Sequence, residues 1–260
     1  MKEKKRKWLT YEKNWLIKHG YSISDLSQYG NMPVEYIVGW APFYQREFKV
    51  SQHVLTPRTE TEELVVLVLK TIQQYYSNQK QLKIIEVGTG SGVIAITLLL
   101  ELVEMGFLPQ IVASDVSKEA LQVAESNAQL FLEKSDDCYF YEDAQLEFRQ
   151  SDLLTNYNIE NKPDLIIANL PYIPTSMMKD LPPEVADYEP ELALNGGDNG
   201  LALIKKMIKQ ARKKFNCVPI LLLEIDERSK VKLTGLGLDG EKVSIINDQY
   251  NRQRFIRFIP

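Results

Sequence analysis

The sequence has 260 residues, of which 44% are hydrophobic and 25% charged, proportions typical of a globular protein with one large domain and a small appendage. It contains no apolar run long enough to cross a bilayer and no signal-peptide pattern, so we expect a cytoplasmic protein without membrane contact. A net charge of −4 disfavours stable nucleic-acid binding, and two histidines and two cysteines without C-x-x-C spacing give no pattern for a metal site.

The N-terminal part of the chain has weak patterning. The basic run at residues 2–7 is expected to be a solvated tail, with a weak contact to an RNA-rich partner as the alternative. Residues 8–30 are expected to include a short helix, because apolar side chains recur at helical spacing. Its stripe consists of Trp8, Tyr11, Trp15 and Ile17. Residues 33–56 loosen into short extended segments.

A change in patterning after Pro57 marks the expected domain boundary. A helix is predicted there, with Thr59 as N-cap and Glu62 completing a capping box. Strand-like and helical patterns then alternate to the end of the chain. We therefore predict a small helical and extended cap over residues 1–56 and one large domain over residues 57–260.

The alternating region predicts a doubly wound α/β fold. Strands are expected at residues 83–87, 110–115, 148–151, 164–168, 218–225, 242–247 and 252–259, and helices at 92–105, 118–132 and 200–215. The acidic stretch 133–146 is predicted to be an irregular surface excursion. Strands separated by helices indicate a mainly parallel sheet, and the last two strands are close enough to form an antiparallel hairpin. This seven-stranded outline is that of the Rossmann-like class I methyltransferase fold.

A glycine-rich turn follows the first strand of this region. The strand containing Glu86 leads into Gly88-Thr89-Gly90-Ser91-Gly92, where missing side chains let the backbone approach a ligand. The spacing is G-x-G-x-G, and Val93 stands where the dinucleotide fingerprint has its third glycine. No Gly-Lys-Ser/Thr follows, so phosphate cradling is not indicated either. We therefore expect this turn to bind a nucleoside without phosphates, S-adenosylmethionine, rather than to be a tight turn that binds no ligand.

Acidic residues end the next two strands. The carboxylate of Asp115 is placed to accept the ribose hydroxyls of such a ligand, and its neighbour Val116 is expected in the same cofactor site. Asp152 is placed to meet the adenine amino group, and Leu153 to lie beside the ring. An Asp at a strand end can also be only a helix cap. The combination with the glycine turn favours the binding role.

The fourth strand of the region ends in Asn169-Leu170-Pro171-Tyr172. Methylation of an amide or exocyclic amine requires that its nitrogen be oriented and its N–H groups accepted, because the lone pair is delocalised. The Asn169 side-chain oxygen and the Leu170 backbone carbonyl can do this, with Asn169 also beside the cofactor. Pro171 fixes the bend, and Tyr172 offers an aromatic face to the planar substrate and its developing positive charge.

The Asn-x-Pro-Tyr tetrad resembles the motif of methyltransferases that act on adenine, cytosine or glutamine nitrogens. Three further stretches, residues 33–39, 55–62 and 183–201, resemble the HemK/PrmC family of protein glutamine N5-methyltransferases. The resemblance runs from about residue 33 to the C-terminus. It implies S-adenosylmethionine as cofactor and class I peptide chain release factors as partners. The glutamine of their Gly-Gly-Gln motif would be methylated, which modulates translation termination.

The sequence departs from that family at four places. Leu170 stands where the family usually has Pro, Thr59 replaces a frequent Pro, and Asp226 replaces a frequent Gly. The N-terminal region that helps dock the release factor is short, so residues 1–56 are expected to be a reduced docking region. Three alternatives remain open: an RNA or DNA adenine N6-methyltransferase, a methyltransferase of a ribosomal-protein glutamine, and a non-catalytic cofactor-binding scaffold.

Overall fold

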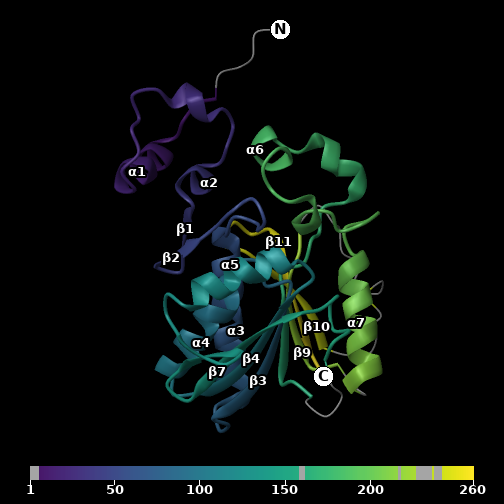
Figure 1. Ribbon diagram of the computed structural model, residues 1–260. Helices are drawn as coiled ribbons and strands as arrows, with labels where there is room; N and C mark the ends of the chain where they lie inside the picture. The colour runs from purple at the N-terminus through teal and green to yellow at the C-terminus, as the bar shows by residue number, and fades with distance from the viewer. Residues whose placement is uncertain (1–5, 158–161, 216–217, 227–235, 237–241) are drawn as a thin grey trace.

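The computed structural model describes residues 6–157, 162–215, 218–226, 236 and 242–260, and its centre is a large sheet with helices on both faces (Figure 1). The strands lie in the order β10-β11-β9-β8-β3-β4-β7-β6-β5. Strands β9, β8, β3, β4 and β7 run parallel, and antiparallel strands extend the sheet at both edges. The predicted doubly wound, mainly parallel α/β class is therefore confirmed. The strands span β3 (Gln81–Val87), β4 (Leu108–Asp115), β5 (Glu133–Ser135), β6 (Cys138–Tyr141), β7 (Ala144–Gln150), β8 (Leu165–Ala168), β9 (Ile220–Glu224), β10 (Lys242–Asn247) and β11 (Gln253–Ile259).

Helices cover the two faces of the sheet with separate apolar clusters. On one face lie α3 (Thr59–Tyr76), α4 (Val93–Glu104) and α5 (Lys118–Ala128), and on the other lies α7 (Ala202–Phe215) (Figure 1). Strands β8 and β9 are buried throughout because they are covered on both sides, which explains their continuous apolar sequences. Within the described residues, every helix is too short or too polar to cross a bilayer.

The N-terminal residues form a small unit with its own sheet. It contains α1 (Thr10–Lys18), η1 (Leu26–Tyr29), α2 (Val34–Val38) and the antiparallel pair β1 (Trp40–Phe43) and β2 (Arg46–Lys49). Leu16, Val34 and Val38 are the buried residues of its apolar cluster. In Figure 1 this unit lies at the same end of the sheet as the segment that carries α6 (Pro183–Ala186). That segment also contains η2 (Thr175–Asp180) and η3 (Glu191–Ala193).

The prediction of an irregular excursion over residues 133–146 is wrong, and so is the count of seven strands. β5 and β6 pair antiparallel with each other and with β7, so the main sheet has nine strands in the described residues. Tyr139 is buried opposite Leu146 and anchors this extension. Short acidic turns separate the strands, and Asp136 and Glu142 adopt positive φ there. These turns interrupt the alternation that would have revealed the strands.

Four predictions for residues 1–62 also need correction. The buried residues of α1 are Glu12 and Leu16, whereas Tyr11 and Ile17 are exposed. Arg6 forms an ion pair with Glu12, so this member of the basic run is packed; residues 2–5 lie outside the described residues. The buried carboxylate gives α1 a polar contact that hydrophobic periodicity could not indicate.

The other two corrections concern residues 33–62. Residues 34–38 form the helix α2, in a region predicted to be extended. α3 begins at Thr59 rather than after it, and Thr59 is not an N-cap. The expected capping box does not form because the Glu62 carboxylate accepts a hydrogen bond from the Tyr44 backbone N–H, 2.9 Å away.

One buried amide joins the N-terminal unit to the main domain. Asn127, fully buried in α5, accepts a hydrogen bond from the Lys49 N–H (2.7 Å) and donates to the Lys49 carbonyl (2.9 Å). It also donates to the carbonyl of Ser91 in the glycine turn (2.8 Å). Asn127 therefore satisfies the backbone of β2 as a neighbouring strand would, and links it to the turn.

We expect Asn127→Ala to lower the free energy of unfolding by about 2–4 kcal/mol, since it leaves buried backbone groups without partners. Denaturant unfolding followed by circular dichroism measures this loss. Gln122→Ala, at an exposed position of the same helix, is the matched control. Equal stability of the two variants would contradict the role assigned to Asn127.

Candidate functional site

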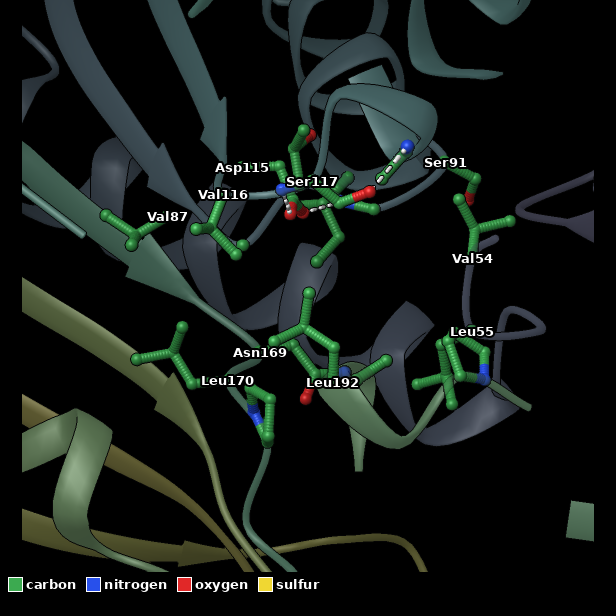
Figure 2. A pocket seen from close by; sticks show the side chains of 18 of the residues that line it. Val54, Leu55, Val87, Ser91, Asp115, Val116, Ser117, Asn169, Leu170 and Leu192 are labelled. Atoms are coloured by element: carbon green, nitrogen blue, oxygen red, sulfur yellow. Dashed lines mark hydrogen bonds between the residues drawn. The ribbon is translucent and has the colours of Figure 1, made fainter. Parts of the chain in front are cut away.

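A cavity of about 420 Å³ opens at the carboxyl ends of the central parallel strands. β3 is followed along the chain by β4 and β7 on one side, and the chain then returns to place β8 on the other side. The loops after β3 and β8 therefore diverge, and the crevice between them is where open α/β sheets bind ligands. Figure 2 shows side chains from these loops around the cavity.

The glycine turn forms one wall of the cavity. Gly88, Gly90 and Gly92 have φ values of +76°, +54° and +81°, a conformation that residues with a Cβ rarely adopt. The N–H groups of Gly88 and Thr89 both donate to the Ser114 carbonyl, at 2.8 and 2.9 Å. The backbone is thereby held against the end of β4. Gly88, Thr89, Gly90 and Ser91 line the cavity, whereas Gly92 packs against α5.

Glu86 lies beneath this turn and does not line the cavity. Its side chain is buried, and its Oε2 accepts a hydrogen bond from the Thr89 hydroxyl at 2.8 Å. Burial raises the pKa of Glu86 to about 7, although the Thr89 hydrogen bond opposes the shift. Glu86 therefore braces the turn from inside the fold.

Asp115 holds the far side of the glycine turn. Its Oδ2 accepts from the Gly90 N–H at 2.9 Å, and its Oδ1 accepts from the Ser117 N–H at 3.0 Å (Figure 2). Burial raises the pKa of Asp115, and the backbone hydrogen bonds to Ser117 and Gly90 partly offset this. Each carboxylate oxygen can accept a further hydrogen bond from a ligand. Val116 also lines the cavity.

Asp152 and Leu153 close the same side of the cavity. Leu153 is buried and adopts a positive φ of 53°, which directs the chain out of β7. The side chain of Asp152 is half exposed and pairs with the Lys206 ammonium of α7 at 2.5 Å. The predicted contact of Asp152 with an adenine amino group therefore stays a prediction, on a carboxylate that already has a cationic partner.

The loop after β8 forms the opposite wall. Asn169, Leu170 and Pro171 line the cavity, and Asn169 donates through Nδ2 to the Thr61 hydroxyl at 3.1 Å. The Leu170 side chain is buried and reaches Gly88, where an added Cβ would lie 3.1 Å from its Cδ2. Tyr172 is not among the cavity-lining residues, and burial raises its pKa, as does the charge of Glu224.

Several cavity-lining residues were not predicted for the site. They include Leu55, Arg58, Thr61, Pro190, Leu192 and Ala193. Arg58 donates to the buried Glu189 carboxylate at 2.5 Å, which ties the start of α3 to the segment after α6. The stretches 55–62 and 183–201 carried the family resemblance, but no local pattern assigned their residues to the cavity.

The cavity fits an adenosine-like cation better than a phosphorylated ligand. The carboxylates of Asp115 and Asp152 line the cavity near the glycine turn, together with hydroxyl and apolar side chains. Arg58, the guanidinium on the opposite side, is paired with Glu189. The glycine turn lets a ligand approach the backbone closely, but it contains no Lys or Arg side chain that could bind a phosphate group.

The raised pKa of Glu86 predicts a pH-dependent stability. Between pH 4.5, its ordinary value, and about pH 7, the unfolded state ionises Glu86 while the folded state keeps it protonated. The folded state therefore binds more protons, and stability falls as pH rises through this window. We expect Glu86→Gln to remove this component, worth up to about 3 kcal/mol. Denaturant unfolding from pH 4.5 to 8 measures it, and parallel curves for the two proteins would contradict the assignment.

Comparison with known proteins places the chain in a family. A methyltransferase-domain family model matches residues 78–218. A release factor glutamine methyltransferase of Bacillus subtilis is 36% identical over 229 residues, covering 86% of this chain and 74% of the relative. One of Bacillus cereus is 34% identical over 75% of this chain and 63% of its own length. The human methyltransferase 10 domain containing protein shares the fold alone, with a TM-score of 0.53, 12% identity, and coverage of 83% of this chain and 89% of that one. The chain belongs to the family of release factor glutamine methyltransferases.

Proposed function

We propose that this protein transfers a methyl group from S-adenosylmethionine to the side-chain amide nitrogen (N5) of the glutamine in the Gly-Gly-Gln motif of class I peptide chain release factors. The observation that carries the proposal is the position of Asn169. It lines the same cavity as the glycine turn, so an acceptor nitrogen held by Asn169 would lie next to a ligand held by the turn. The family membership supports this acceptor.

The residues around the turn are suited to hold the cofactor. When bound, S-adenosylmethionine supplies a methyl group on a cationic sulfur. Gly88 and Gly90 would allow close backbone approach, and Asp115 would accept ribose hydroxyls. Val116 and Leu153 offer apolar surface to the adenine.

The loop after β8 would orient the acceptor. The Asn169 Oδ1 and the Leu170 backbone carbonyl would accept the two N–H bonds of a glutamine amide, which would direct the nitrogen lone pair toward the methyl group. Leu170 could replace the more common Pro here because the backbone carbonyl would make this contact. Its side chain meanwhile packs in the core beside Gly88.

The shape of the cavity supports a small-residue loop as the substrate. Leu55, Pro190 and Leu192 line it, and Leu192 is 59% exposed. In the view of Figure 2, Leu55 and Leu192 lie across the cavity from Asp115 and Ser117. A flat amide flanked by glycines can pass such apolar walls with little steric hindrance.

We further infer that the methyltransferase domain spans residues 57–260 and that residues 1–56 form a cap that contacts the release factor. The separate β1–β2 sheet and the apolar cluster around Leu16 support this division. The cap lies at the end of the sheet where the cavity opens, so a docked protein could reach both (Figure 1).

Asp115→Ala is expected to weaken the binding of S-adenosylmethionine by ~1.5–3 kcal/mol, the usual cost of losing a hydrogen bond to a charged group. The variant also loses the acceptor for the Gly90 N–H, which loosens the turn. Titration calorimetry measures the affinity, and circular dichroism checks that the variant is folded. Unchanged affinity would remove Asp115 from the cofactor site.

The proposed reaction is tested by transfer of labelled methyl groups to a purified release factor. We expect label on the intact factor and none on a Gln→Ala version or on protein-free ribosomal RNA. Asn169→Ala should abolish turnover and leave cofactor affinity within a few-fold, whereas Leu170→Pro keeps the backbone carbonyl and should retain turnover with lower stability.

Label on the RNA with none on the factor would overturn the proposal in favour of an adenine methyltransferase. Label on a ribosomal protein instead would keep the chemistry and change the partner. A folded protein that binds the cofactor without any turnover would indicate a scaffold.

A further inference from the structure

We propose that Thr61 and Glu224 are positioning residues that fix the orientation of the Asn169 side-chain amide, so that its oxygen faces the substrate nitrogen. The inference rests on the proposed function for the identity of the acceptor. Thr61 lines the cavity, whereas Glu224 is not among the cavity-lining residues.

The three side chains form a hydrogen-bonded chain. Asn169 Nδ2 donates to Thr61 Oγ1 at 3.1 Å, and Thr61 Oγ1 donates to Glu224 Oε2 at 2.9 Å. Thr61 and Glu224 are only 4% and 1% exposed, so water does not compete for these bonds. The participants come from the first turn of α3, the end of β9 and the loop after β8.

The chemistry of these groups allows hydrogen-bond donation along this series of side chains in one direction only. A threonine hydroxyl has a single proton, and Thr61 donates it in the hydrogen bond to the carboxylate oxygen of Glu224. Its oxygen can then only accept, so the amide end that meets it must be the NH₂ group of Asn169. Rotating the amide by 180° would set two acceptor oxygens against each other and leave buried groups unpaired.

The direction depends on the ionised form of Glu224, which can only accept hydrogen bonds. Burial raises the pKa of Glu224 to about 7, against the opposing hydrogen bond from Thr61 and the charge of Arg254. A protonated carboxyl group can donate as well as accept, so it no longer imposes a direction on the Thr61 hydroxyl. The Asn169 amide is therefore held in one orientation at pH values above this pKa, where Glu224 is ionised.

The orientation decides what Asn169 offers to a substrate. With its NH₂ group held by Thr61, the free end of the amide is the Oδ1 oxygen, an acceptor for the N–H of a glutamine amide. The reversed amide would present N–H groups to the N–H groups of the substrate, which repel. The chain from Glu224 thus makes the site selective for a nitrogen that carries protons.

The experiment compares three threonine variants. Thr61→Val keeps the shape and removes the hydroxyl, and we expect kcat to fall by on the order of 10²-fold, as for loss of one preorganised contact at the reacting atoms. KM for the release factor and the affinity for S-adenosylmethionine should stay within about threefold. Thr61→Ser restores the hydroxyl and should recover most of the lost kcat. Thr71→Val, a buried position of the same helix whose hydroxyl bonds to Leu67, is the control and should leave kcat unchanged.

A double-mutant cycle separates positioning from general damage. If Thr61 acts through Asn169, Thr61→Val should cause no further loss in the residual methyl-transfer rate of Asn169→Ala, measured in long single-turnover incubations at high enzyme concentration. Glu224→Gln offers Thr61 both a donor and an acceptor, so the direction is no longer imposed and an intermediate loss is expected. Additive losses in the cycle would overturn the inference.

A second measurement requires no substrate. The side-chain amide protons of Asn169, assigned by NMR through their absence in Asn169→Ala, should exchange slowly in wild type and in Thr61→Ser. They should exchange faster in Thr61→Val. Unchanged exchange in Thr61→Val would refute the positioning role even if the enzyme proves inactive toward release factors. Inactivity of the wild type would instead refute the proposed function alone.

Discussion

The alignment of β3 between β4 and β8 is the constraint on which the rest of the site depends. Val87 lies opposite Ser114 on one side and Ala168 on the other, so the three strands end at one level. The loops that follow them must then start beside one another. A shift of one residue in the β3–β8 register would move the loop at Asn169 along the sheet and turn its side chains to the other face. Burial of β8 on both faces holds this register.

The sequence was sufficient to predict those parts of the site that are formed by residues adjacent in the chain. The glycine turn requires positive φ at alternating positions, and this requirement is visible as G-x-G-x-G. The loop at Asn169 follows a buried apolar strand directly. Because parallel strands bring their carboxyl ends to one edge, the two motifs could be placed together without coordinates. Their assignment to a nucleoside and an acceptor nitrogen followed from the chemistry of the residues.

The sequence was insufficient where a residue acts through a distant partner. Thr61 and Glu224 are 163 positions apart and look like an ordinary helix start and a strand end. Arg58 and Glu189 are 131 positions apart, and only the fold pairs them. The hairpin of β5 and β6 was missed for a different reason. β5 and β6 are only three and four residues long and are bounded by acidic turns, so the alternation never extends over enough residues to stand out.

The three hydrogen bonds of Asn127 have a thermodynamic consequence. The amide holds the cap through Lys49 and the glycine turn through Ser91, so order in one place favours order in the other. A ligand that binds the ordered turn more tightly must also stabilise the docked cap. Linkage makes the effect reciprocal, because a partner that fixes the cap raises the affinity of the turn by the same factor. Occupancy of the cavity and order of the cap are then coupled through one side chain, without a change of fold.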